Sequence, residues 1–116
     1  MILYISQNLI KNHSSITSYN KGLYLYYNDE IISYEIDSLF NTATAIIGRK
    51  DPQTVVLTFS TENKQIHSNC TCKKNYGSLC EHSVAMLMET AKRDQLGEFE
   101  RTRFSSRAAS IKFPSW

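Results

Sequence analysis

The stretch CTCKKNYGSLCEH, residues 70–82, holds all three cysteines of the 116-residue chain and one of its three histidines. Its spacing is C-x-C, then seven residues, then C-x-H, and it supplies four candidate metal ligands: Cys70, Cys72, Cys80 and His82. Three thiolates and one imidazole complete the tetrahedral shell of a structural zinc site. Zn²⁺ prefers sulfur and nitrogen ligands of this kind. The sequence therefore predicts a closed zinc site, with Zn²⁺ as the cofactor.

Other interpretations of the cysteines account for the pattern less well. Free cysteines are often small buried hydrophobic residues, but three of them beside a histidine within thirteen residues indicate a ligand set. A disulfide framework would leave one of the three cysteines over, and a redox pair usually has C-x-x-C spacing. A copper or redox-sensing site is a further alternative. His13 and His67 lie outside the cluster, and His67 is expected to be exposed on a strand.

No catalytic arrangement accompanies the cluster. A catalytic zinc site keeps one position open for water, whereas four protein ligands are offered here. His82, the histidine that would serve as a base, is assigned to the metal. The phosphate-binding pattern G-x-x-x-x-G-K-[ST] does not occur in the sequence. We therefore expect this chain alone not to be an enzyme and to have no small-molecule substrate.

The segments on either side of the cluster predict a strand that leads into it and a helix that leaves it. Residues 65–70 form the strand and deliver the first ligand pair. Cys80 is expected just before the helix and His82 in its first turn, where the helix dipole favours a thiolate. The apolar face of this helix, which would pack on a sheet, is formed by Val84, Leu87, Met88 and Ala91.

Further upstream, residues 32–36, 42–47 and 54–59 are β-branched or alternate apolar with polar side chains, which predicts strands. Short links make neighbouring strands antiparallel. The chain is thus predicted to have an α+β fold: a small antiparallel sheet of three to four strands with an N-terminal helix. A strand–zinc knuckle–helix unit completes it at the C-terminal end.

The N-terminal part predicts helices. Residues 7–12 are expected to form a short helix, and Ser15 or Ser18 to cap the next one. Gly22 lies inside that second helix, where glycine costs about 1 kcal/mol relative to alanine, so another segment is expected to approach closely there. One face of the second helix is formed by Ile16, Tyr19, Leu23 and Tyr26.

Charge divides the chain into two parts. Residues 1–91 carry seven lysines and arginines against eight acidic residues, a net charge of −1, and residues 92–116 carry six against three, a net charge of +3. We therefore expect a zinc-binding domain with an N-terminal helical segment over residues 1–96 and a basic tail or linker over 97–116. Thiols that serve a metal indicate a reducing, cytoplasmic setting. No apolar run approaches the length of a membrane span, so no membrane partner is expected.

The C-x-C-x₇-C-x-H spacing, followed at once by an apolar helical run, resembles the SWIM zinc finger, with Glu81 where that family more often has lysine. The segment from Tyr19 to Tyr27, followed by residues 31–34, looks like the opening of bacterial Swi/Snf-type helicases, in which a SWIM module precedes the motor. The resemblance covers about residues 6–93. It implies a zinc-stabilised module that binds DNA or protein, ahead of a motor.

Two classes of partner follow from this resemblance and from the charges. In the first, the module contacts DNA or RNA, and the lysines and arginine best placed to meet phosphates are Lys73, Lys74, Arg49 and Lys50. In the second, it is a protein-interaction or regulatory module that docks on the motor or on another protein without nucleic-acid contact. The weak net charge of residues 1–91 and Glu81 favour the second class slightly.

Overall fold

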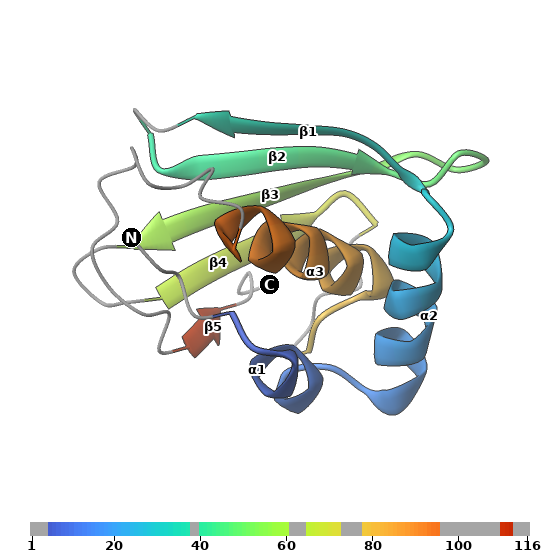
Figure 1. Cartoon of the computed structure of the whole chain (residues 1–116), viewed down its shortest axis with the longest axis horizontal. Coiled ribbons are helices and arrows are strands. Elements are labelled where there is room, and N and C mark those ends of the chain that lie inside the picture. Colours follow the sequence, from blue (N-terminus) through green and yellow to red (C-terminus); the bar gives the residue numbers. More distant parts are fainter. Residues whose placement is uncertain (1–4, 38–39, 61–64, 73–77, 96–109, 113–116) are drawn as a thin grey trace.

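Five strands and three helices make up the part of the chain that the structure describes, residues 5–37, 40–60, 65–72, 78–95 and 110–112 (Figure 1). The structure is a computed structural model. In chain order the elements are α1 (Gln7–Asn12), α2 (Ile16–Tyr27), β1 (Ile31–Asp37), β2 (Thr42–Ile47), β3 (Gln53–Ser60), β4 (Gln65–Cys70), α3 (Glu81–Gln95) and β5 (Ser110–Lys112). None of these helices is long and apolar enough to cross a membrane.

Strands β1 to β4 lie side by side in chain order, each antiparallel to the next. Alternate side chains of β2, β3 and β4 point to one buried face, as the alternating pattern predicts. Cys70 stands on this face, because it pairs with Val55, which in turn pairs with Ala45. The predicted α+β fold with an antiparallel sheet is therefore confirmed. The buried face consists of Ala43, Ala45, Ile47, Val55, Leu57, Phe59, Ile66, Ser68 and Cys70.

The strand β5 joins the edge of β4 in parallel orientation, with Ser110 beside Gln65 and Lys112 beside His67. It lies within residues 97–116, for which the sequence predicts a basic tail or linker. The rest of that stretch is outside the described residues. Three residues are too few to show an alternating pattern, and their partner strand lies far back in the chain. Local sequence therefore carries no signal for β5.

The inward-facing residues of β1 differ at one position from the predicted alternation. Tyr34 and Ile36 pack against the core as predicted, but Ile32 is 48% exposed and Ile31 takes its place at the core. The ladder between β1 and β2 shifts register between Ile31 and Ser33. Such a bulge adds one residue to the strand. Because successive side chains of a strand point to opposite faces of the sheet, one extra residue moves every side chain before the bulge to the opposite face.

Serines cap both N-terminal helices. Ser6 Oγ accepts a hydrogen bond from the Leu9 N–H at 3.0 Å, and Ser15 Oγ accepts one from the Ser18 N–H at 3.1 Å. Each bond satisfies a backbone donor that the first helical turn leaves without a partner. Of the two predicted caps for α2, Ser15 is therefore the one that the structure uses.

The predicted apolar face of α2 is largely confirmed. Ile16 is the exception, because this first residue of the helix is 77% exposed. Helical periodicity assigns a residue to a face, but it does not show how far along the helix the partner extends. The residues that do pack against the core from this face are Tyr19, Leu23 and Tyr26.

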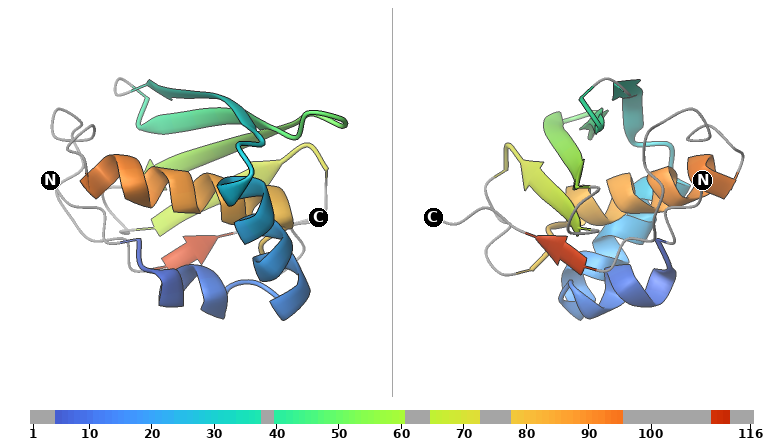
Figure 2. Two further views of the ribbon diagram at one scale, coloured as in Figure 1. Left: turned by 45° about the vertical axis from the view of Figure 1, so that its right-hand side comes forward. Right: turned by 90° about the vertical axis from the view of Figure 1, so that its left-hand side faces the viewer.

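The helix α3 is the central element of the fold. It packs against β2, β3 and β4 on one side and against α1 and α2 on the other (Figure 1; Figure 2). Residues 83–88 are all buried, and so is Thr90. The predicted single apolar stripe is therefore too narrow. The helix is covered on two sides, because Val84 meets Gly22 of α2, whereas Ser83 and Thr90 face the sheet, where their hydroxyl groups lie 2.9 and 2.8 Å from those of Ser68 and Tyr34.

Gly22 marks the closest approach of α2 to α3, as predicted. A Cβ atom on Gly22 would lie 2.4 Å from Val84 Cβ and 2.9 Å from the carbonyl oxygen of Glu81. Both distances are shorter than van der Waals contact. A side chain at position 22 would therefore force the two helices apart.

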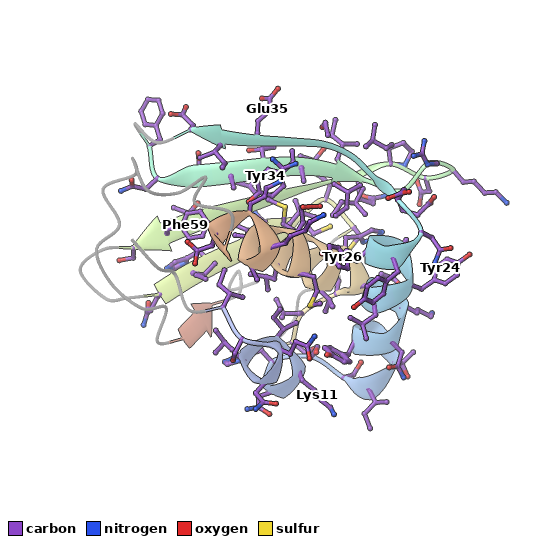
Figure 3. All side chains as sticks on the ribbon, viewed as in Figure 1. Lys11, Tyr24, Tyr26, Tyr34, Glu35 and Phe59 are labelled. Carbon is purple, nitrogen blue, oxygen red and sulfur yellow. The ribbon has the colours of Figure 1, made fainter. Side chains whose placement is uncertain are left out.

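Tyr34 ties the sheet to the second half of α3 (Figure 3). Its hydroxyl group lies 2.8 Å from Thr90 Oγ1, at hydrogen-bond distance. The guanidinium carbon of Arg93 lies 4.1 Å from the centre of the Tyr34 ring, a cation–π geometry. Arg93 Nε also lies 3.4 Å from a carboxylate oxygen of Glu89, one turn earlier. These contacts fix α3 over β1 at the end away from the cysteines.

Candidate metal centre

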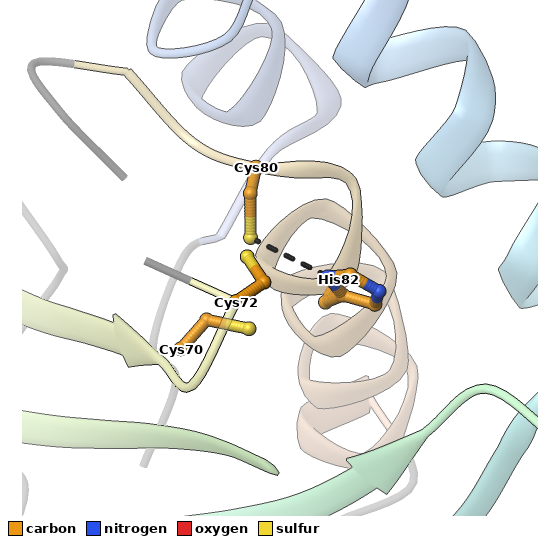
Figure 4. Close-up of side chains that lie close together, drawn as sticks. All are labelled: Cys70, Cys72, Cys80 and His82. Carbon is orange, nitrogen blue, oxygen red and sulfur yellow. Dashed lines mark hydrogen bonds between the residues drawn. The ribbon is translucent and has the colours of Figure 1, made fainter. Parts of the chain in front are cut away.

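Cys70 and Cys72 lie where β4 ends (Figure 4), and the residue between them is hydrogen-bonded to β3. The Thr71 N–H donates to the Thr54 carbonyl at 3.0 Å, and the Thr54 N–H donates to Thr71 Oγ1 at 2.9 Å. The Thr71 hydroxyl donates in turn to Gln53 Oε1 at 2.7 Å. These three bonds hold the backbone between the two cysteines in one conformation.

Cys80 and His82 lie at the start of α3, as predicted. Cys80 directly precedes the helix, and His82 is in its first turn, where the dipole favours negative charge on a nearby sulfur. The residue before them, Leu79, is fully buried. Its N–H donates to the carbonyl of His13 at 2.7 Å. The turn between α1 and α2 therefore anchors the second ligand pair.

The four predicted ligands come together around one point (Figure 4). One ligand atom from each of Cys70, Cys72, Cys80 and His82 lies within 4.8 Å of all the others. The distance from Cys80 Sγ to His82 Nδ1 is 3.9 Å. In a tetrahedral site with metal–sulfur bonds of about 2.3 Å, the ligand atoms stand about 3.8 Å apart. The cluster thus has the dimensions of a site for a single ion.

Burial and hydrogen bonding distinguish the three cysteines. Cys70 and Cys80 are buried, whereas Cys72 is half-buried. A hydrogen bond with Cys70 and further ones with His82 and Ser83 lower the pKa of Cys80, although burial opposes them. The pKa of Cys70 is raised, first by its hydrogen bond to Cys80 and then by burial. The arrangement favours a thiolate at Cys80, and a metal ion would displace the remaining thiol protons.

This donor set fits a metal ion. Three sulfurs and one imidazole nitrogen suit a borderline-soft divalent cation, and four protein ligands close a tetrahedral shell. Within the described residues, this is the one group of three or more histidine, cysteine or acidic side chains that is close enough to share an ion. No family model, curated protein or solved structure matches the chain. The assignment of a metal site therefore depends on the geometry of these four residues.

A depression of about 650 Å³ lies beside the metal site. Cys72 and His82, the two half-buried ligands, line it together with Tyr24 from α2. Arg49 and Lys50, in the loop after β2, also line it. The fold therefore places two of the four predicted phosphate-contacting residues next to the metal ligands. The other two, Lys73 and Lys74, lie outside the described residues.

The guanidinium group of Arg49 is engaged within the protein. Its Nε and Nη2 donate to the carbonyl of Asp29 at 3.2 and 2.7 Å, and Nε lies 3.5 Å from a carboxylate oxygen of Glu30. Arg49 thus joins the loop after β2 to the turn between α2 and β1. Lys50 is exposed beside it. His67 is exposed on β4 and is no part of the ligand cluster, as predicted.

The spacing of the ligands does not identify the polar residues that hold them in place. Spacing alone says nothing about Thr71, because any residue can fill the middle of C-x-C. Ser83 lies among the buried residues of α3, and its N–H and hydroxyl are both 3.4 Å from Cys80 Sγ. The position of Ser68 could have indicated its role, because it is a polar residue on the core-facing side of β4, between Ile66 and Cys70.

Proposed function

We propose that the chain is a zinc-stabilised binding module of the SWIM type, which contacts DNA or a protein. The observation that carries the proposal is the arrangement of the ligands. The C-x-C pair ends a strand, the C-x-H pair begins the helix that follows, and the four ligand atoms converge. The spacing, and the helix that follows it at once, are the features on which the SWIM resemblance is based.

Zinc is the ion that this ligand set suits best, and we expect one Zn²⁺ per chain. Metal–sulfur distances of about 2.3 Å and a metal–nitrogen distance of about 2.0–2.1 Å are expected. Elemental analysis of protein purified without added metal gives the stoichiometry, and X-ray absorption at the zinc edge gives the ligand types. Protein that contains no zinc, or a shell that includes His67, would contradict the assignment.

The resemblance over residues 6–93 also supports a cellular context. We propose that the module belongs to a cytoplasmic Swi/Snf-type helicase and precedes the motor. In this proposal the module itself catalyses no reaction, because its four protein ligands fill the zinc shell. Its role is to bring the motor to DNA or to a partner protein.

A protein partner is the second candidate, and the depression beside the metal ligands favours it. Glu30, Asp51 and Glu81 line this depression, and the Arg49 guanidinium is engaged with Asp29 and Glu30. A surface with three carboxylates against one engaged arginine and Lys50 is a poor match for a phosphate backbone. Contact with DNA would then depend mainly on Lys73 and Lys74.

A salt titration of binding distinguishes the two candidates. We expect weak binding to duplex DNA without sequence preference, with a slope of log affinity against log salt of about −1.8, the value for two phosphate contacts. The double variant Lys73→Glu/Lys74→Glu is expected to abolish this binding in a mobility-shift assay at low salt.

The matched control reverses two exposed lysines on α1 and α2 that do not line the depression, in Lys11→Glu/Lys21→Glu. It changes the net charge of the protein by the same amount and is expected to keep most of the binding. If the unmodified module binds no DNA, or if the Lys73/Lys74 variant binds as well as the parent, the protein-docking function takes the place of DNA binding.

A further inference from the structure

Two buried serines form a hydrogen-bonded row that ends at the sulfur of Cys80. Ser68 on β4 and Ser83 on α3 are 1% and 0% exposed, and their hydroxyl oxygens are 2.9 Å apart. Ser83 Oγ lies 3.4 Å from Cys80 Sγ, and the Ser83 backbone N–H donates to the same sulfur at 3.4 Å. The three side chains form a continuous hydrogen-bonded row from the sheet to the metal ligand.

Metal binding determines which group donates in each hydrogen bond of this row. A metal-bound cysteine has lost its proton and can only accept hydrogen bonds, so the Ser83 hydroxyl donates to Cys80 Sγ. The Ser83 oxygen is then left as an acceptor, and the Ser68 hydroxyl donates to it. Hydrogen bonds in such a chain polarise and so strengthen one another. The low dielectric constant of the protein interior makes each bond electrostatically stronger than it would be in water.

Burial explains why Cys80 requires these donors more than Cys72 does. Three thiolates around a divalent ion leave one excess negative charge, which is costly to bury without hydrogen-bond donors. Cys72 borders the depression, where water can reach it, whereas Cys80 is 2% exposed. The two hydrogen bonds from Ser83 take the place of water at the buried sulfur.

We propose that Ser83, oriented by Ser68, is a positioning residue of the metal centre that stabilises the Cys80 thiolate and slows loss of the metal. The inference rests on the proposed zinc site and deepens it. Hydrogen bonds to a ligand orient it and tune its interaction with the metal, and their loss typically weakens metal binding by about 10–100-fold.

The experiment compares Ser83→Ala and Ser68→Ala with the parent protein by chelator competition for zinc and by the absorption spectrum of the Co²⁺-substituted form. Ser83→Ala keeps the backbone N–H, so we expect a loss of zinc affinity near the lower end of the range, about tenfold. The thiolate-to-cobalt charge-transfer band should move to longer wavelength, because a sulfur with fewer hydrogen bonds gives up electron density more easily. Ser68→Ala should change both quantities in the same direction, but less.

Thr90→Ala is the matched control. Thr90 is a buried hydroxyl on the same helix, and it is hydrogen-bonded to the Met86 carbonyl and close to the Tyr34 hydroxyl, away from the cysteines. Its removal should lower the melting temperature but leave the zinc affinity and the cobalt band unchanged. This control separates positioning of the ligand from general stability.

The outcomes are distinct. Unchanged zinc affinity and an unchanged cobalt band in Ser83→Ala would overturn the inference and leave the zinc site intact. Parent protein that binds neither ion would overturn the proposed function and this inference with it. If Ser83→Ala does not fold, Ser68→Ala decides, because it keeps the contact between Ser83 and Cys80. An unshifted band in Ser68→Ala would then overturn the proposed row of donors.

Discussion

Chelation of the metal is expected to unfold the whole domain rather than the segment around the cysteines alone. A structural zinc ion contributes on the order of 10 kcal/mol in small finger peptides, and a domain of this size has a total stability of only about 5–15 kcal/mol. A metal ion held by the four ligands would join the end of β4 to the start of α3, and α3 is buried between the sheet and the other two helices. Loss of α3 would therefore expose the core on both of its sides.

Removal of one ligand should have the same effect, so Cys72→Ser and His82→Ala are expected to lose cooperative thermal unfolding. Near-ultraviolet circular dichroism follows the packing of the aromatic residues, and far-ultraviolet dichroism follows the helices. His67→Ala is the control, because this exposed histidine on β4 lies outside the ligand cluster. A ligand variant that melts at the temperature of the parent protein would show that the cluster does not support the fold.

Gly22→Ala is expected to destabilise the domain, although alanine is the better helix former. Alanine would gain about 1 kcal/mol in helix propensity, but its Cβ would lie 2.4 Å from Val84 Cβ. Val84 Cβ is fixed to the backbone of α3 and cannot rotate away, so the helices must separate. Overpacking of this kind costs about 1–3 kcal/mol and occasionally more. With a cost near the upper end of that range, we expect a net loss of about 2 kcal/mol after the gain in helix propensity.

Urea unfolding measures this loss directly, and the melting temperature should fall by roughly 10 °C. Zinc affinity should fall as well, because the second close contact of position 22 is the carbonyl of Glu81, which lies between Cys80 and His82. Lys21→Ala is the control. It is an exposed position on the same helix, and its effect should stay within about 0.5 kcal/mol. Gly22→Ala protein as stable as the parent would contradict the close approach.

The sequence predicts most of the fold because the signals that define it are local. The β-branched and small residues of 42–47 predict one strand, the alternation in 54–59 predicts the next and its buried face, and short links determine the antiparallel order. The ligand set is predicted by spacing, since two closely spaced pairs of soft ligands have few other uses. The close approach at Gly22 could be predicted because glycine is unfavourable inside a helix, so its presence there indicates tight packing.

The remaining features depend on contacts between distant segments. The bulge in β1 arises from its pairing with β2, so the exposure of Ile32 has no local cause. Ser83 and Thr90 are polar residues of α3 that are buried because their hydroxyl groups meet those of Ser68 on β4 and Tyr34 on β1. The engagement of Arg49 depends on Asp29 and Glu30, which lie in a different turn. Periodicity and spacing do not report such pairings, so these features became visible only in three dimensions.

The central place of α3 has a consequence for how the protein folds as it is synthesised. The helix α3 follows α1, α2 and the strands β1 to β4 in the chain. The apolar faces of these elements therefore remain exposed during synthesis until α3 has left the ribosome. Capture of the proposed zinc ion would need Cys80 and His82, which emerge at the same stage. Closure of the core and metal capture should therefore be one late, cooperative event. A nascent chain stalled before Cys80 would present an open apolar sheet with two reactive thiols, a species prone to aggregate.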